Sequence, residues 1–475
     1  MTKLKEFSQK NILIVGLGQE GESSFDFLRS LFPQLKIGLA DQKEEKDLAS
    51  SFREKIKSDS QAELLAGEKF PLSPGNYNLL IRSPGVPLDL PLFQKAKQKG
   101  VEISSQTKIF FNNTSSKIIG VTGTKGKSTV ASLIYHLLRY GQFKVNLAGN
   151  IGQPILSLFL KKFSLGEKDT FYVYELSSHQ LVDLDQSPEI AVFTNLYPDH
   201  LDYFSNLEEY AQSKLNLIRY QIKEDTLIYN LDDPWLSQEA GKQKGEKFPF
   251  SLAEVEEAFC FLSQDWIAYR HQAGGKARKI IPVKEIPLKG KFNLQNIMPS
   301  IIIGRRLGMT PKAIREAIRS FHSLEHRLTE IGTFRGITFY DDSNATIPEA
   351  TISALNVLDS RVGTLILGGS EKGLSFNFLA KKILKSKVKT LILFPSTGKE
   401  IWEAVSQQFS ESGRGYQLPQ FFPAQSMQEA VQLAYQWTEK GKICLLSPAS
   451  ASFSLFRNYR ERGKLFQKWV KELSR

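Results

Sequence analysis

The sequence is poor in cysteine and has no apolar run long enough to span a membrane. Its two cysteines, Cys260 and Cys444, lie far apart and match no metal-ligand spacing, which excludes a disulfide-stapled fold and fits a reducing compartment. No stretch approaches the roughly 20 apolar residues of a membrane helix. The opening residues, MTKLKEFSQKNILIVGLG, lack the apolar segment and cleavage site of a signal peptide. We therefore expect a cytoplasmic protein with no membrane partner.

The length and composition of the chain are those of a globular protein with several domains. At roughly 100–200 residues per domain, 475 residues suggest about three domains. Hydrophobic residues make up 41% of the chain and charged residues 24%, which is ordinary for a soluble protein. The net charge of +12 suits an anionic ligand such as a polyphosphate, and it equally suits a surface rich in solubilising lysine.

Strand and helix patterns alternate along the chain, which predicts doubly wound α/β domains. Apolar runs at 11–15, 117–121 and 337–340 predict strands near the start of each unit, and the polar stretch 112–116 (NNTSS) is a candidate linker. Residues 42–69 are rich in charge and poorly periodic, so we expect exposed helix and loop there. The predicted domains are residues 1–114, 115–325 and 326–475.

The segment TGTKGKST, residues 122–129, lies between a predicted strand and a predicted helix. Its glycines let backbone N–H groups face phosphate oxygens, and the helix N-terminus adds positive potential. Lys127 can reach terminal phosphates and the Ser128 hydroxyl can bind Mg²⁺, although a strict Walker A motif would place glycine at Val121. We predict an ATP phosphate site formed by Gly123, Thr124, Lys125, Gly126, Lys127, Ser128 and Thr129.

Two polar side chains follow later strands of the same unit. Glu175 in YELSSH ends one predicted strand, and His200 in NLYPDH follows the next. Because ligands bind at the carboxyl edge of a parallel sheet, we expect both to face residues 122–129, with Glu175 as a Mg²⁺ ligand. Taken singly, Glu175 fits a turn cap and His200 a solvated loop residue, but the phosphate motif favours the metal-site interpretation.

A second glycine-rich turn, GLGQEG at residues 16–21, follows the first predicted strand. Asp41 lies twenty residues beyond Gly21, as in dinucleotide-binding domains. Taken alone, this pattern favours NAD or FAD and an oxidoreductase. The same kind of turn also binds other diphosphates, so the pattern leaves the ligand open.

Four polar motifs follow or adjoin strand ends in the third unit: HR at 326–327, DDSNAT at 341–346, GGSEKG at 368–373 and SPASAS at 447–452. Arg327 fits a bidentate contact to a phosphate or carboxylate, and Lys372 fits a contact to a carboxylate. Each motif by itself also fits a surface turn or a helix cap.

In their order along the chain, these motifs resemble those of the Mur ligase family over essentially the whole sequence. They are joined by SPG at 83–85, GNIG at 149–152, DHLDYF at 199–204 and KFNLQN at 291–296. The GLG start and the SPG turn favour the D-glutamate-adding branch. The resemblance implies a Rossmann-like N-terminal domain that holds UDP rather than NAD, a central P-loop ATPase domain with a mostly parallel sheet, and a C-terminal Rossmann-like domain for the incoming amino acid.

The resemblance also assigns residues to ligands. It places UDP-sugar contacts at Gly18, Gln19, Asp41, Ser83 and Asn150, further ATP contacts at Asn296, Arg327 and Asp342, and D-glutamate contacts at Thr346, Lys372, Ser452 and Tyr459. It implies two Mg²⁺ ions, one held by Ser128 and Glu175 and the other by His200 and Lys214. The family counterpart of Lys214 is carbamylated, which supplies an anionic oxygen ligand to a hard ion. Lys127, His200 and Lys214 would be the catalytic residues.

The implied reaction joins D-glutamate to UDP-N-acetylmuramoyl-L-alanine in peptidoglycan precursor synthesis, after ATP has activated the carboxylate as an acyl phosphate. Its partners are small molecules and not nucleic acid, and we expect a monomer. A folylpolyglutamate-synthetase-like ligase would share the last two domains, but the additional N-terminal domain argues against it. Asn344, Ser450 and Ser454 depart from the family's motifs near the acceptor amino acid, so a related ligase for another amino acid is an alternative.

Overall fold

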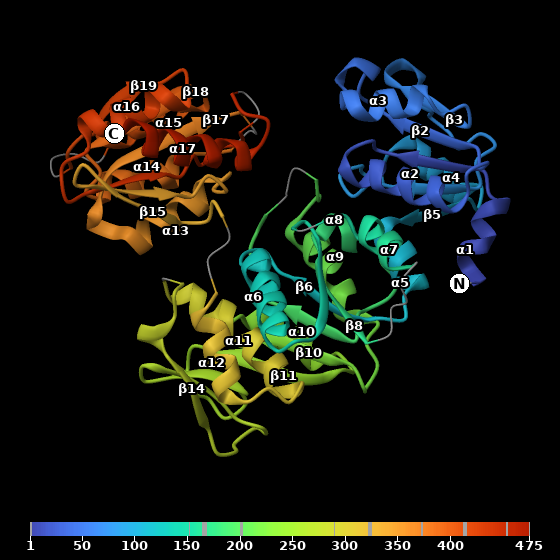
Figure 1. Ribbon diagram of the computed structural model, residues 1–475, viewed down its shortest axis with the longest axis horizontal. Coiled ribbons are helices and arrows are strands. Elements are labelled where there is room, and N and C mark those ends of the chain that lie inside the picture. Colours follow the sequence, from blue (N-terminus) through green and yellow to red (C-terminus); the bar gives the residue numbers. More distant parts are fainter. Residues whose placement is uncertain are drawn as a thin grey trace. The chain divides into compact units, whose positions relative to one another are not determined.

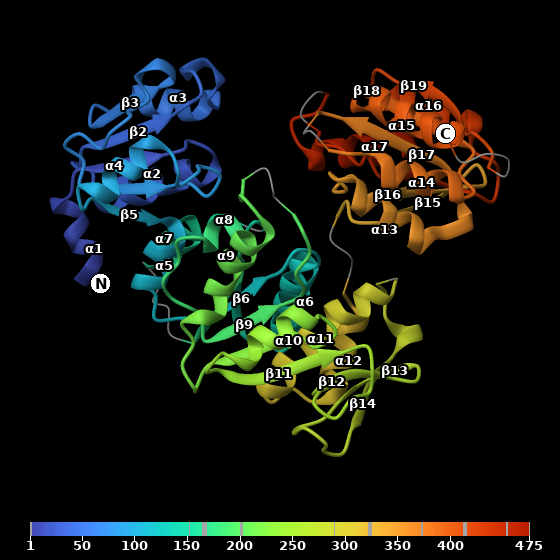
Figure 2. The same cartoon turned by 180° about the vertical axis from the view of Figure 1, so that it is seen from behind.

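The computed structural model describes residues 2–151, 153–163, 169–199, 203–288, 290–321, 325–371, 374–411, 416–452 and 455–474. Within these ranges the chain forms three sheets with helices packed on them (Figures 1 and 2). One compact unit contains Met1–Pro287 and Lys291–Phe321, and the other contains Leu288–Gly290 and His322–Arg475. The first unit holds two of the sheets, and the second holds the third. This architecture confirms the expected α/β class with three domains and mostly parallel sheets.

The N-terminal sheet has the strand order β3-β2-β1-β4-β5, and all its strands pair in parallel. Its strands are β1 (Ile12–Val15), β2 (Ile37–Asp41), β3 (Ala62–Ala66), β4 (Leu79–Arg82) and β5 (Glu102–Ser105). Its helices are α1 (Thr2–Lys5), α2 (Gln19–Leu31), α3 (Ser50–Lys57), α4 (Pro91–Gln98) and α5 (Gln106–Asn113). The prediction of helix and loop alone over 42–69 was wrong, because β3 lies there. It is an edge strand without the buried apolar run of a central strand such as β1.

The central sheet has the order β14-β13-β12-β11-β10-β9-β6-β8-β7, parallel from β7 to β12 and antiparallel over its last three strands. Its strands are β6 (Lys117–Thr122), β7 (Lys144–Gly149), β8 (Thr170–Glu175), β9 (Ile190–Phe193), β10 (Thr226–Asn230), β11 (Glu246–Ser251), β12 (Cys260–Ser263), β13 (Trp266–Tyr269) and β14 (Arg278–Pro282). Its helices are α6 (Lys127–Tyr140), α7 (Ile155–Phe163), α8 (Ser178–Leu181), α9 (Leu207–Arg219), α10 (Pro234–Gly241), α11 (Lys291–Arg306) and α12 (Pro311–Arg319).

The C-terminal sheet has the order β15-β16-β20-β17-β18-β19, and only the edge strand β15 pairs antiparallel. Its strands are β15 (Thr329–Phe334), β16 (Ile337–Asp341), β17 (Val362–Gly369), β18 (Thr390–Ser396), β19 (Gln420–Pro423) and β20 (Ile443–Leu446). Its helices are α13 (Pro348–Leu358), α14 (Asn377–Lys385), α15 (Thr397–Glu411), α16 (Met427–Trp437) and α17 (Tyr459–Leu473).

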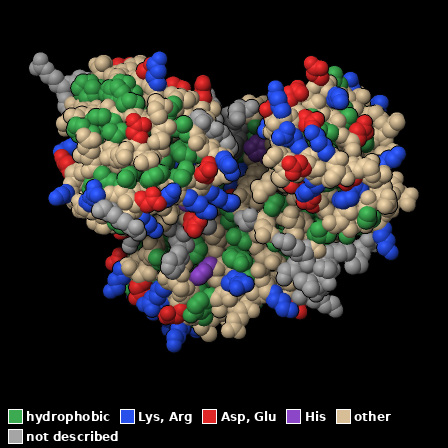
Figure 3. All heavy atoms as spheres, turned by 45° about the horizontal axis from the view of Figure 1, so that its top comes forward, with side chains coloured by type: hydrophobic (Ala, Val, Ile, Leu, Met, Phe, Trp, Pro, Cys, Tyr) green, Lys and Arg blue, Asp and Glu red, His purple; other side chains and the backbone are tan. Residues whose placement is uncertain are grey.

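On the face shown in Figure 3, basic and acidic side chains are interspersed. On this face, the net charge of +12 is therefore better explained by solubilising surface lysines than by a patch for an anionic ligand. Among the helices in the described ranges, none is both long and apolar enough to cross a bilayer.

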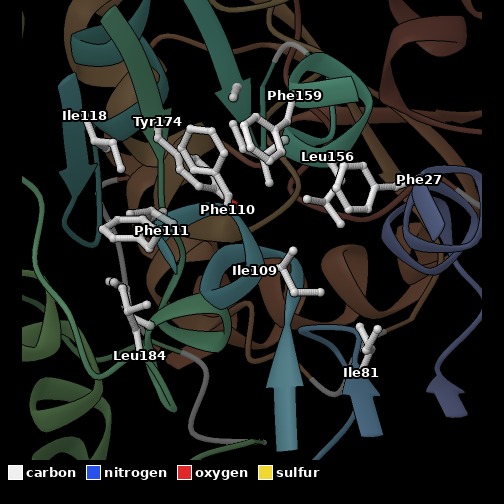
Figure 4. Close-up of a cluster of buried hydrophobic side chains, with 14 of the residues drawn as sticks. Phe27, Ile81, Ile109, Phe110, Phe111, Ile118, Leu156, Phe159, Tyr174 and Leu184 are labelled. Atoms are coloured by element: carbon white, nitrogen blue, oxygen red, sulfur yellow. The ribbon is translucent and has the colours of Figure 1, made fainter. Parts of the chain in front are cut away.

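A single hydrophobic core joins the N-terminal and central domains (Figure 4). The ring of Phe27 on α2 stacks on Phe159 of α7, with centroids 5.9 Å apart. Phe110 on α5 lies edge-on to Phe159 at 5.4 Å and to Tyr172 on β8 at 4.9 Å. Because these rings come from both sides of the predicted linker at 112–116, the two domains share this core and fall within one compact unit.

We expect Phe110→Ala to lower the free energy of unfolding of the first unit by about 3–5 kcal/mol, since it removes a fully buried ring and leaves a cavity between the two domains. Urea denaturation followed by tryptophan fluorescence measures the change. Leu72→Ala is the control because that side chain is 64% exposed, and its effect should stay within about 0.5 kcal/mol. A loss below about 1 kcal/mol for Phe110→Ala would contradict this account of the core.

Candidate functional site

The loop after β6 leaves the middle of the central sheet. β6 lies between β8 and β9, so residues just beyond the ends of both neighbours flank this loop. The loop needs glycine at two places, because Gly123 has φ +146° and Gly126 has φ +83°. Gly126 caps α6, which begins at Lys127, so the loop leads directly into a helix N-terminus as predicted.

Residues that follow β9 hold the loop in place. The backbone N–H of Thr124 donates to the carbonyl of Asn195 at 2.9 Å, and that of Lys125 donates to the Asn195 side-chain oxygen at 2.8 Å. The hydroxyl of Thr194 donates to the Lys125 carbonyl at 2.8 Å. Sequence reasoning did not single out Thr194 or Asn195, and only their position beside β6 reveals this role.

Glu175 and Ser128 meet beneath the loop. The Ser128 hydroxyl donates to Glu175 Oε1 at 2.9 Å, and the two residues are 6% and 2% exposed. The expectation that Glu175 faces residues 122–129 is therefore met. The pair brings a hydroxyl and a carboxylate together next to the predicted phosphate site.

Lys214 reaches the same loop from α9. Its Nζ donates to the carbonyl of Gly123 at 2.9 Å and lies 4.8 Å from the ring centroid of Tyr210. The side chain is almost completely buried. Burial lowers the pKa of Lys214 well below its usual value, and the neighbouring Lys127 lowers it further.

The other predicted residues of the loop also lie at this edge of the sheet. Lys127 Nζ donates to the Thr124 carbonyl at 3.0 Å, and Lys125 forms a 3.2 Å ion pair with Asp199. Asn296 on α11 lies against the loop, since a Cβ at Gly126 would be 2.3 Å from its Oδ1. Thr129 follows Ser128 in the first turn of α6. His200, Lys372 and Ser454 lie outside the described residues.

Most of the predicted UDP-sugar residues gather at the edge of the N-terminal sheet. Ser83 Oγ donates to the Gly16 carbonyl at 2.6 Å, and the Leu17 N–H donates to Asp41 Oδ2 at 2.7 Å. Gly18 and Gln19 of the same turn are exposed. Asn150 is different, because it follows β7 of the central sheet and its N–H donates to the Glu175 carbonyl at 3.4 Å.

In the second unit, Asp342 of the motif DDSNAT lies close enough to Arg327 for the charge of that guanidinium to act on its carboxyl. Asp342 accepts from the Leu328 N–H at 3.0 Å and from Ser447 Oγ at 2.8 Å. Burial raises the pKa of Asp342 to about 7. Asn344, with its side-chain oxygen turned toward Arg327, accepts from Nε and Nη2 at 3.0 and 3.2 Å.

A buried polar network that sequence reasoning missed supports this motif. His326 Nδ1 lies 2.7 Å from Asp341 Oδ2. Arg462 on α17 is buried, and its Nη2 donates to the carbonyls of Ser343 and Ser450 at 2.8 and 3.1 Å. Arg462 therefore ties DDSNAT to SPASAS. Of the residues predicted for D-glutamate, Ser452 is buried in SPASAS, Thr346 ends DDSNAT, and Tyr459 begins α17.

Three family models match the chain in sequence order. The Mur ligase MurD-like N-terminal domain matches residues 10–105, the Mur ligase middle domain residues 121–304, and the Mur ligase glutamate ligase domain residues 326–450. The UDP-N-acetylmuramoylalanine–D-glutamate ligase of Acetivibrio thermocellus is 33% identical over 99% of each chain. The enzyme of that name from Koribacter versatilis is 32% identical over 98% of each chain.

Solved structures share the fold. The UDP-N-acetylmuramate-alanine ligase of Thermotoga maritima superposes with a TM-score of 0.58 over 98% of this chain and 100% of its own, at 16% identity. The folylpolyglutamate synthase of Mycobacterium tuberculosis superposes with a TM-score of 0.55 over 78% of this chain and 93% of its own, at 13% identity.

We expect Gly126→Ala to weaken nucleotide binding at least tenfold, because a Cβ there would lie 2.3 Å from Asn296 Oδ1 and would displace this side chain from the loop. Gly308→Ala is a matched control: Gly308 has φ +84°, against +83° for Gly126, but a Cβ would meet nothing within 4 Å. Both variants should lose about 1–2 kcal/mol of stability from the backbone strain. Calorimetric titration with ATP should show the defect in Gly126→Ala alone, and equal affinities in the two variants would refute the steric argument.

Asp342→Asn should flatten part of the pH dependence of stability. In the folded protein the pKa of Asp342 is about 7, against 3.8 for the free residue, so the native state holds a proton that the unfolded chain releases. The stability contributed by the protonated side chain is complete below the unfolded pKa and is lost as the pH rises through the folded one. Relative to Asp342→Asn, the wild type should lose about 3 kcal/mol between pH 5 and pH 8 in urea unfolding. A constant difference between the two proteins across this range would show that Asp342 titrates normally.

Proposed function

The chain belongs to the Mur ligase family, and we propose that it joins D-glutamate to UDP-N-acetylmuramoyl-L-alanine in an ATP-dependent step of peptidoglycan precursor synthesis. Three domain models of this family match the chain in their order along the sequence, which supports the proposal. Relatives named UDP-N-acetylmuramoylalanine–D-glutamate ligase, which are matched over nearly their whole length, support it as well. The observation that carries it is the cluster of Ser128, Glu175 and Lys214 around the loop after β6.

The donors at this cluster fit a magnesium ion. Ser128 and Glu175 offer a hydroxyl and a carboxylate oxygen 2.9 Å apart, and Mg²⁺ prefers hard oxygen ligands with substrate phosphates completing its shell. We assign the first Mg²⁺ of MgATP to these two residues. When bound, it would neutralise charge on the terminal phosphates.

A second Mg²⁺ is proposed at Lys214 and His200. The support for Lys214 is its position, because its amine is buried against the Gly123 carbonyl within the same cluster. Carbamylation would convert this amine into an oxygen ligand, which is the chemistry that a hard cation requires. The resemblance alone carries the assignment of His200.

The proposed reaction needs activation because a carboxylate is a poor electrophile. The terminal carboxylate of the L-alanyl group attacks the γ-phosphorus of ATP, its bond to phosphorus forms, and ADP leaves. The amine of D-glutamate then attacks the acyl carbon, phosphate leaves, and the amine loses a proton. Lys127 at the start of α6 is placed to stabilise charge on the terminal phosphates, so most of the catalysis is positioning and electrostatics.

The remaining assignments extend to both compact units. We assign the nucleotide sugar to Gly18, Gln19, Asp41, Ser83 and Asn150; ATP to residues 123–129 with Asn296, Arg327 and Asp342; and D-glutamate to Thr346, Lys372, Ser452 and Tyr459. One chain supplies all of these residues, which supports a monomer. ATP and nucleotide sugars are cytoplasmic metabolites, which supports a cytoplasmic enzyme.

The competing interpretations of the sequence are weaker. An oxidoreductase would leave the cluster of Ser128, Glu175 and Lys214 unexplained. A folylpolyglutamate-type ligase does not account for the N-terminal domain, which the MurD-like model matches over residues 10–105. A Mur ligase for another amino acid is the remaining alternative. The test is an assay of phosphate release from ATP, with UDP-N-acetylmuramoyl-L-alanine and a panel of D- and L-amino acids. Our proposal predicts release with D-glutamate. Release with a different amino acid instead would favour the alternative ligase and contradict our proposal.

We expect Lys127→Ala to lower kcat/KM for ATP by about 10²–10³-fold, since it removes the cation that we assign to the terminal phosphates. Binding of the nucleotide sugar, measured by calorimetry, should remain nearly unchanged. Lys144→Ala is the matched control, because this exposed lysine begins β7 at the opposite end of the sheet from the loop. Normal turnover by Lys127→Ala would remove our assignment of the phosphate site.

A further inference from the structure

The N-terminal domain holds the short helix α8 from two sides. On one side, Gln180 Nε2 donates to Glu20 Oε1 at 2.8 Å. On the other, Arg82 Nη2 donates to the carbonyl of His179 at 2.8 Å and to Asp183 Oδ1 at 3.2 Å. Helix α8 follows β8 closely, so both contacts act on the segment just beyond Glu175.

The two contacts come from the two turns to which we assign the nucleotide sugar. Glu20 belongs to GLGQEG, and Arg82 immediately precedes SPG. Arg82 is buried, and its Nη1 also donates to the carbonyls of Pro84 and Val86 at 2.9 and 3.0 Å. A single guanidinium thus shapes the SPG turn and joins it to α8.

Glu20 lies inside this domain interface. Its backbone carbonyl accepts from the Nε2 of Gln106, a residue that is 2% exposed. Desolvation raises the pKa of Glu20 to about 7, although the hydrogen bond from Gln180 and the charge of Arg82 oppose that rise. The Glu20 side chain is therefore packed into the interface between the N-terminal and central domains and is not solvated like a surface carboxylate.

Hydrogen bonds continue from Gln180 toward the phosphate loop. Gln180 Oε1 accepts from the backbone N–H of Ser177 at 2.9 Å, and Ser177 caps α8. Ser177 lies two residues after Glu175, which accepts from Ser128 at the start of α6. A short path of bonded groups thus connects the GLGQEG turn to the loop after β6.

We propose that Glu20 is a positioning residue for ligation, which through Gln180 sets the turns that hold the nucleotide sugar in register with the loop that holds ATP. This inference rests on the proposed function, because only a substrate that spans both domains needs this register. A misplacement of about 1 Å at a reacting centre can lower the rate by about 100-fold. Glu20 does not itself recognise the substrate, since above its pKa of about 7 its negative charge would repel a diphosphate at the same turn.

The sign of this charge gives the test. Glu20→Ala removes the acceptor for Gln180 and also a charge that opposes diphosphate binding. We expect kcat to fall at least tenfold, while the dissociation constant for UDP-N-acetylmuramoyl-L-alanine stays the same or decreases. Glu20→Gln loses the charge but keeps an oxygen that accepts from Gln180, so its kcat should return to within about threefold of the wild type.

Two further variants separate positioning from general destabilisation. Glu22→Ala removes a neighbouring carboxylate of α2 that pairs with Lys55 instead of α8, and its kcat should be unchanged. Gln180→Met removes the amide from the other partner and should reproduce the loss. The double variant Glu20→Ala/Gln180→Met should lose no more than Gln180→Met alone, because Gln180→Met already breaks the bond to Glu20 together with the bond from Ser177.

Three results would overturn the proposal: a kcat for Glu20→Ala within twofold of the wild type, a failure of Glu20→Gln to restore it, or losses that multiply in the double variant. Should Glu20→Ala not fold, Glu20→Gln and Gln180→Met still decide the matter. A wild-type protein that releases no phosphate with any amino acid contradicts the proposed function. An active wild type with an unaffected Glu20→Ala contradicts only the role of Glu20.

Discussion

The position of β6 between β8 and β9 is the constraint on which the chemistry of the central domain depends. The loop after β6 has to turn through left-handed conformations at Gly123 and Gly126, and Asn195 beyond β9 holds it there by three hydrogen bonds. The end of β8 supplies Glu175 on the other side. Because three parallel strands end at one edge, residues far apart in the sequence share one small volume.

Electrostatics at this edge point to an anionic ligand. Lys125 and Lys127 lie at the N-terminus of α6, and the Lys214 amine lies against the same loop, with the carboxylates of Asp199 and Glu175 nearby. Lys214 shows how unfavourable a further positive charge is at this edge, because burial and the nearby Lys127 both lower its pKa. A polyphosphate supplies the negative charge that such an arrangement favours. The local arrangement, more than the net charge of the chain, is therefore the argument for a nucleotide.

The sequence predicted best those features that depend on local pattern. The strand–turn–helix around residues 122–129 and the position of Glu175 followed from glycine placement and strand ends. Strand β3 was missed because an edge strand lacks the continuous apolar run of a buried one. Arg82 and Arg462 were missed for a different reason. Both are buried arginines whose partners lie in distant segments, and no spacing in the sequence relates them.

Asn344 shows how the structure changes the meaning of a departure from a family motif. In sequence, asparagine in place of lysine removes a charge near the proposed acceptor site. In the structure, its side-chain oxygen accepts from Nε and Nη2 of Arg327, and a lysine, which has no acceptor, could not make these two contacts. The asparagine holds the guanidinium in one orientation and leaves Arg327 as the cation of this motif. The departure thus changes the charge and geometry around Arg327. The proposed ATP chemistry rests on the Ser128–Glu175–Lys214 cluster, whose contacts do not involve Asn344.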